Sequence, residues 1–99
     1  MSRYTASDVI AATCRVYGCK RELLVSCESA IYQRRREIAV AAAVRLGIAP
    51  TDIGRPLGMD RNRASDVVDS IDMDAISRPN IINPIINSIV DAVRRRLVA

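Results

Sequence analysis

Apolar residues recur at helical spacing along most of the chain, and glycines, prolines and capping residues divide this pattern into segments. The first segment predicts a helix over 8–17, with Ser7 as its N-cap and Gly18 as its C-terminal stop. Because the apolar positions of this segment follow one face, we expect the helix to pack on the domain through that side.

The next part of the chain predicts a short helical turn over 20–25 and a long helix over 29–46. The short turn is expected to carry Leu23 and Leu24 inward. The first half of the long helix is polar and basic, whereas residues 38–44 are apolar on nearly every side. A helix that is apolar all round is buried all round, so this one should be the central element of the domain.

Two shorter helices are predicted after the long one. The first begins near Pro50, and Gly58 ends it after a few residues. Asp60 is placed to cap the second, over 61–72. The positions of this second helix that should face inward are Ala64, Val67, Val68 and Ile71.

The C-terminal part predicts a final helix over 81–97, which follows a break at 78–80. The apolar stripe of this helix consists of Ile82, Ile85, Ile86, Ile89, Val93 and Leu97. Together the segments predict an all-α fold of about five helices, organised as a single domain over residues 1–99.

The charge distribution favours a polyanionic partner. The net charge is +4, and all but one of the fifteen basic residues are arginine, the side chain best suited to phosphates and guanine edges. Residues 33–63 hold seven arginines against three acidic residues, whereas residues 64–93 hold one arginine against five aspartates. Because the chain has no Phe or Trp, it does not match modules that stack single-stranded bases on aromatic side chains.

Residue types that metal sites and catalysis need are scarce. The chain has no His, and Cys14, Cys19 and Cys27 form no Cys-x-x-Cys pair, so neither a metal site nor a cofactor is expected. No nucleophile or carboxylate pair stands in a recognisable catalytic arrangement, so we do not expect an enzyme. An odd cysteine count without a signal peptide is typical of free thiols in a reducing cytoplasm, and no apolar run approaches the roughly 20 residues that cross a membrane.

Residues 51–71 have the layout of a helix-turn-helix. Such a motif needs a small residue where its two helices cross and a residue that tolerates positive φ in the turn, and Gly54 and Gly58 meet these requirements. The motif also needs apolar residues that lock the angle between the helices, and the candidates are Ile53, Leu57, Met59, Ala64 and Val67.

In a helix-turn-helix, the N-terminal end of the second helix enters the major groove of duplex DNA. Arginine can pair there with guanine, and asparagine can pair with adenine. Arg55 is placed for a phosphate contact, whereas Arg34, Arg35 and Arg36 form either a second DNA contact or a solvated helix face. The outward positions of the second helix are Arg61, Asn62, Arg63, Ser65 and Asp66.

Several short segments resemble one known DNA-binding family. They are Leu23-Leu24, Arg36-Glu-Ile-Ala-Val40 after its arginine-rich run, Pro50-Thr-Asp-Ile-Gly54, and Leu57-Gly58 followed by Asp60. In this order they resemble domain IV of the bacterial replication initiator DnaA, and the similarity covers residues 8–72. It implies a Trp-repressor-like helix-turn-helix core that binds short duplex sequences, with the C-terminal helix as an addition.

The sequence departs from that family in two respects. Arg61, Asn62 and Arg63 stand where the recognition helix of the family has His-Thr-Thr, which predicts a different target sequence. The AAA+ ATPase region of the initiator has no counterpart in this chain. We therefore expect a sequence-specific double-stranded DNA-binding protein in the cytoplasm, associated with the nucleoid, most simply a small transcriptional regulator of chromosomal or phage-derived genes.

Other interpretations stay open. A replication-origin accessory factor would use the same DNA-binding motif. The acidic residues Asp66, Asp69, Asp72 and Asp74 could instead dock on RNA polymerase or on a replication protein. The apolar stripe of the final helix could close the core or form a homodimer, and Arg94–Arg96 could complement the dipole of that helix.

Overall fold

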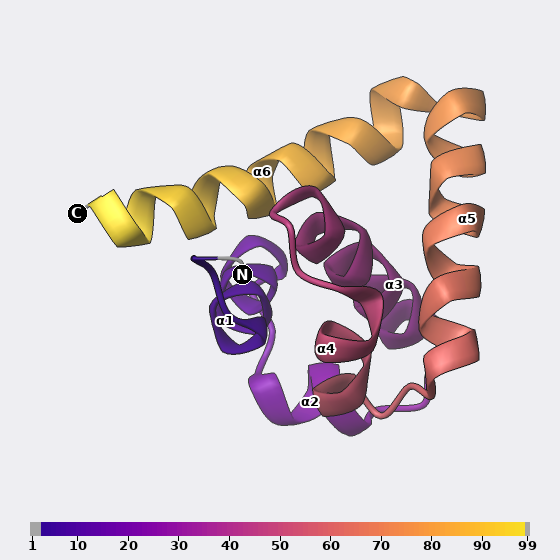
Figure 1. The fold of residues 1–99 in the computed structure, drawn as a ribbon, viewed down its shortest axis with the longest axis horizontal. Helices are drawn as coiled ribbons and strands as arrows, with labels where there is room; N and C mark the ends of the chain where they lie inside the picture. The colour runs from indigo at the N-terminus through magenta and orange to yellow at the C-terminus, as the bar shows by residue number, and fades with distance from the viewer. Residues whose placement is uncertain (1–2, 99) are drawn as a thin grey trace.

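The computed structural model describes the backbone of residues 3–98 and the side chains of residues 3–96. Within that range the chain is all-helical, which confirms the predicted fold class (Figure 1). The elements are α1 (Ala6–Tyr17), α2 (Arg21–Ser26), α3 (Ala30–Arg45), α4 (Pro50–Gly54), the 3-10 helix η1 (Arg55–Leu57), α5 (Arg61–Ser77) and α6 (Pro79–Val98).

Helix α3 lies at the centre of the molecule. It contacts α1, α2, α4, α5 and α6, and its second half is enclosed by them. Every residue from Ile38 to Ala43 is buried, as the apolar run predicts. Because five of those six positions carry Ala or Val, neighbouring helices can approach α3 closely.

Helix α1 begins two residues earlier than the sequence pattern predicts, and its N-cap is Thr5 rather than Ser7. The Thr5 hydroxyl accepts a hydrogen bond from the Asp8 backbone N–H at 3.2 Å, and the Asp8 carboxylate accepts one from the Thr5 N–H at 3.0 Å. This reciprocal capping box satisfies two backbone donors, whereas Ser7 as N-cap would have no acidic partner three residues later. Gly18 ends the helix at φ 66°, as predicted.

The short helix α2 buries Leu24, but Leu23 is 42% exposed, so the prediction that both leucines point inward is wrong for Leu23. Successive residues of a helix are rotated by about 100° from each other, and a helix that packs on one side cannot bury two neighbours equally.

Helices α5 and α6 meet at a corner and lie along two sides of the core (Figure 1). The second helix of the predicted motif continues to Ser77 instead of ending near 72, and the final helix begins at Pro79. The lengthened end of α5 is held to α3 by a hydrogen bond from Arg34 Nη2 to Asp74 Oδ2 at 2.6 Å, a contact between segments far apart in the sequence.

The apolar stripe of α6 belongs to the core. Ile82, Ile86, Ile89 and Val93 are all buried against the helices beneath them, whereas the side chain of Leu97 lies outside the described residues. Four of the six residues of the stripe are therefore covered within one copy of the chain, and Ile85 is partly buried against the core. A homodimer formed through this helix stays a prediction. No helix in the described part of the chain combines the length and the apolar character needed to cross a membrane.

Candidate nucleic-acid interface

The two helices of the predicted motif cross at Gly54. A Cβ atom at this position would lie 2.9 Å from Ala64 Cβ and 3.4 Å from Met59 Cβ. Contacts of 2.9 Å are closer than carbon atoms tolerate, so α4 and α5 can adopt this crossing only because residue 54 is glycine. Ala64, on the facing side of α5, is fully buried. The role predicted for Gly54 is thus confirmed.

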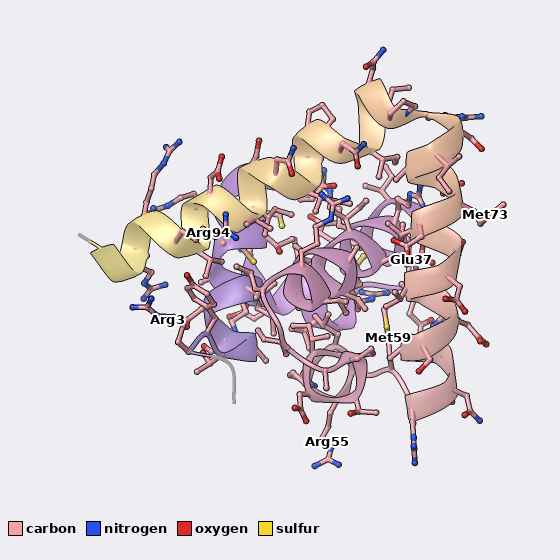
Figure 2. The ribbon with its side chains drawn as sticks, turned by 45° about the horizontal axis from the view of Figure 1, so that its top comes forward. Arg3, Glu37, Arg55, Met59, Met73 and Arg94 are labelled. Atoms are coloured by element: carbon pink, nitrogen blue, oxygen red, sulfur yellow. The ribbon has the colours of Figure 1, made fainter. Side chains whose placement is uncertain are left out.

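The turn between the helices is set by backbone geometry and by two apolar anchors. Gly58 has φ 74°, in the left-handed region that glycine adopts without strain. Beyond it, the Met59 N–H donates to the Gly54 carbonyl at 2.8 Å and closes the turn. Leu57 is 2% exposed and Met59 is 8% exposed, and Figure 2 shows Met59 between α4 and α5. These side chains fix the direction in which α5 leaves the turn.

Asp60 caps α5, as predicted. Its Oδ1 accepts a hydrogen bond from the Arg63 backbone N–H at 2.7 Å, and its own backbone is extended. The first turn of an α-helix has N–H groups without intrahelical acceptors and carries the positive end of the helix dipole. The start of α5 is therefore a well-defined, exposed helix terminus that favours an anionic partner.

The first turns of α5 leave every predicted base-contacting residue on the surface. Ala64, Val67 and Ile71 form the buried side of the helix, which fixes the opposite side outward. The exposed residues are Arg61, Asn62, Arg63, Ser65 and Asp66. The structure thus brings these five predicted residues together on one short helical segment.

Open grooves flank the start of α5 on both sides. The groove toward α4 is lined by Pro50, Thr51, Arg55, Met59, Asp60, Arg61 and Ser65. The groove toward α3 is lined by Glu37, Asp60, Asn62, Arg63, Asp66, Val67 and Ser70. Three polar residues there, Thr51, Glu37 and Ser70, are absent from the residues predicted from sequence. Thr51 could have been found because it is in the first turn of α4, but Glu37 approaches α5 only through the tertiary fold.

Arg55 extends from the α4–η1 junction, away from the body of the molecule (Figure 2). Its side chain is exposed, and it lines the same groove as Arg61. An exposed guanidinium in this position is free to contact a partner bound at the start of α5, and the predicted phosphate contact of Arg55 stays a prediction.

The three consecutive arginines of α3 do not form one surface. Arg36 is 8% exposed, and its Nη1 donates to the Leu24 carbonyl at 2.8 Å, which ties α3 to α2. It is therefore neither a solvated residue nor an outward DNA contact. Arg34 donates to Glu37 at 3.3 Å as well as to Asp74. Burial alone would lower the pKa of Arg34, but these hydrogen bonds raise it above its ordinary value.

Arg35 lies between two aromatic rings. Its guanidinium carbon is 4.7 Å from the centroid of Tyr17 and 4.9 Å from that of Tyr32, distances typical of cation–π contacts. Burial raises the pKa of Tyr17 despite the nearby Arg35 charge, so the ring stays neutral. Arg34 and Arg35 thus have partners within the protein. The prediction that these side chains of α3 contact DNA is therefore not supported by free, unpartnered arginines.

The charges at the start of the motif nearly balance. Arg55, Arg61 and Arg63 are accompanied by exposed Asp52, Asp60 and Asp66. Within the described residues no group of His, Cys, Asp and Glu is arranged to hold a metal ion. What the site offers is a correctly oriented helix end with hydrogen-bonding side chains, rather than a strongly positive field.

Comparison with known proteins gives no further guidance on this site. No protein-family model and no curated protein sequence matches the chain.

Proposed function

We propose that the chain binds double-stranded DNA through α4, the turn and α5, and reads base edges with the first turns of α5. The observation that carries this proposal is the crossing at Gly54 together with the left-handed turn at Gly58. Helical hairpins that only pack do not need a crossing this close. The geometry leaves Arg61, Asn62 and Arg63 exposed at the helix end that a recognition helix inserts.

The chemistry of the exposed residues supports sequence-specific contacts. Arg61 and Arg63 can each form a bidentate pair with guanine, and Asn62 can form one with adenine, each giving about 1–3 kcal/mol of discrimination. Asp66, one turn farther along, can accept from cytosine N4 and repels misplaced phosphates. Arg55 and the backbone N–H groups at the start of α5 would hold phosphates and so set the register.

A small regulator of transcription at the nucleoid, in the cytoplasm, is the simplest role for such a module. A replication-origin accessory factor is the alternative within DNA binding, and the target site would separate the two roles. No catalytic step or cofactor is proposed, because binding at the recognition helix accounts for the exposed polar residues.

The test is selection from a random duplex library at fixed, near-physiological salt. Wild type should enrich a short motif. Arg61→Ala/Arg63→Ala should relax that motif at one or two positions, while the urea midpoint stays unchanged because both side chains are exposed. The matched control is Lys20→Ala/Arg78→Ala, which removes the same charge from exposed positions outside the site and should keep the motif. Lack of enrichment by wild type would overturn the proposal.

A second candidate function is docking of a protein on the outer face of α5. Met73 and Ile76 are 64% and 76% exposed, one turn apart, and exposed Asp69 and Asp72 lie beside them. Apolar side chains this exposed often mark protein contacts. Met73→Ser/Ile76→Ser would leave the selected DNA motif intact but abolish co-purification with a basic partner such as an RNA polymerase subunit. Retention of that partner by the variant would exclude this face.

A further inference from the structure

A second group of positive side chains lies at the end of the molecule formed by α1 and α6. We call it the α1–α6 arginine group, and all its members are exposed. They are Arg3, Arg15, Arg94, Arg95 and Arg96. Three segments of the chain contribute to it: the residues before α1, the last turn of α1 and the last turns of α6.

Tertiary packing brings these segments together. Helices α1 and α6 contact each other extensively, and Arg15 and Arg96 line the same small groove between them, next to Asp8. Figure 2 shows Arg3 and Arg94 at this same end of the molecule. The three consecutive arginines of α6 are therefore joined on the surface by arginines from other segments of the chain.

The charge at this end is not neutralised locally. Among the described residues, half-buried Asp8 and exposed Asp91 are the acidic residues of α1 and α6, and the Asp8 carboxylate accepts the capping hydrogen bond from the Thr5 N–H. No ion pair involves any of these arginines within the described residues. Two helices, α1 and α6, end here, and their dipoles together amount to about one elementary charge, which does not account for a group of this size.

We propose that the α1–α6 arginine group binds the phosphate backbone of a second DNA duplex. The group has the side chains that grip phosphates bidentately, and within the described residues it presents the C-terminal turns of α1 and α6 rather than the N-terminal end of a recognition helix. Its binding is thus independent of sequence and strongly dependent on salt.

The group lies apart from the start of α5, so a second duplex can bind to it while α5 holds the first (Figure 1). The molecule extends 32 Å along its longest axis, with the start of α5 toward one end and the C-terminal end of α6 at the other (Figure 1). A single copy would therefore bridge two duplexes, or two distant segments of one. The bridging rests on the proposed function of α5, whereas phosphate binding by the α1–α6 arginine group does not.

The test is co-capture of two duplexes by the full chain. A biotinylated 30-base-pair duplex on beads is incubated with protein and then with a fluorescent duplex of the same sequence, at a salt concentration where wild type binds. Wild type should retain the fluorescent duplex. Arg94→Gln/Arg96→Gln should lower that retention about tenfold and reduce the log–log salt slope of duplex binding by about two, because two phosphate contacts are lost.

Two comparisons make the result specific. Lys20→Gln/Arg78→Gln removes the same charge from other exposed positions and should capture like wild type. Light scattering must show a monomer, because a dimer would bridge without the arginine group. Arg61→Ala/Arg63→Ala should lose co-capture but keep the salt-dependent binding of one duplex. That result would support separate sites at the start of α5 and at the α1–α6 arginine group. Loss of all duplex binding in that variant would mean that the α1–α6 arginine group holds no DNA.

The remaining outcomes are also decisive. Unchanged capture and salt slope in Arg94→Gln/Arg96→Gln would overturn the proposal. The helical circular dichroism of this variant should match that of wild type, because both side chains are exposed. Vesicles of phosphatidylglycerol serve as a parallel probe. If the variant loses vesicle binding but keeps duplex capture, the partner of the surface is an anionic membrane and not DNA. Failure of the α5 motif selection alone would leave phosphate binding by the arginine group intact.

Discussion

The two ends of this molecule carry complementary parts of what a DNA-binding protein needs. The helix-turn-helix end has a defined helix terminus, a tight crossing at Gly54 and hydrogen-bonding side chains, but its three arginines are matched by three aspartates. Within the described residues, the α1–α6 end has five arginines, whereas α1 and α6 carry one aspartate each. The closely packed helix crossing and the defined helix terminus lie at one end, and the excess of positive charge lies at the other.

If both proposals hold, this difference separates the sequence specificity of DNA binding from its non-specific affinity. Base readout depends on the position and direction of a few side chains, and excess positive charge nearby would favour any sequence equally. Phosphate attraction depends on the number of cations, and tolerates imprecise geometry. A chain that places the two on separate surfaces can adjust each of them without changing the other.

The largest effect is expected from Gly54→Val, which should disrupt the crossing of α4 and α5 and leave the α1–α6 end unchanged. The new side chain would collide with Ala64, since even a Cβ would be 2.9 Å from Ala64 Cβ. We expect a loss of about 3 kcal/mol in the free energy of unfolding, measured by urea titration, together with loss of sequence selection. Gly54→Ala should cost less, and adding Ala64→Gly should restore most of that loss. A normal urea midpoint in Gly54→Val would contradict the crossing described here.

A smaller effect is expected from Arg36→Met, which distinguishes internal from external arginines. The substitution removes the hydrogen bond to the Leu24 carbonyl and should lower the free energy of unfolding by about 2 kcal/mol. The salt slope of duplex binding should stay unchanged. Arg63→Gln is the control with the opposite expectation. Its urea midpoint should be unchanged, and its salt slope of duplex binding should be smaller. If Arg36→Met lowered the slope of a fully folded protein, Arg36 would belong to the DNA surface after all.

The charge balance at the helix-turn-helix end can be tested at Asp60. Asp60→Ala removes the cap of α5 and should cost about 1 kcal/mol of stability. Asp60→Asn keeps a capping side chain while removing one negative charge, so the urea midpoint should hold. Non-specific duplex binding should then tighten about threefold, because a carboxylate near phosphates is gone. Weaker binding by Asp60→Asn, measured by fluorescence anisotropy, would argue against DNA at this end.

The smallest expected effect concerns thiol reactivity and leaves stability untouched. Burial, with a contribution from Cys19, raises the pKa of Cys14 to about 11, so at pH 8 roughly one thiol in a thousand is ionised. Hydrogen bonds from Ser29 lower the pKa of Cys27. Iodoacetamide at pH 8 should therefore modify Cys27 before Cys14, as peptide mass spectrometry can follow. Equal rates would mean that the Cys14 thiol is less shielded than the fold indicates.

Much of the local structure could be predicted from sequence because its causes are local. The glycine stops at residues 18 and 58, the Asp60 cap and the all-apolar run of α3 depend on backbone conformation and on periodicity. The five exposed residues at the start of α5 follow from the same reasoning, since a buried Ala64 fixes which side faces out. The N-cap of α1 was missed by two residues, because Thr5 and Ser7 are both good caps and only the partner Asp8 distinguishes them.

What depended on the tertiary structure is how the arginines are used, because the partners of a long charged side chain come from distant segments. The sequence presents Arg34, Arg35 and Arg36 as one basic run, yet each has a different partner: Asp74, two tyrosine rings and the Leu24 carbonyl. Conversely, Arg15 and Arg96 are far apart in the sequence and line one groove. The sequence by itself determined an all-α chain with a glycine turn between α4 and a capped α5, since helices, caps and turns are encoded within a few residues. Only the packing of α1, α3, α5 and α6 decided which positive charges are available to a partner.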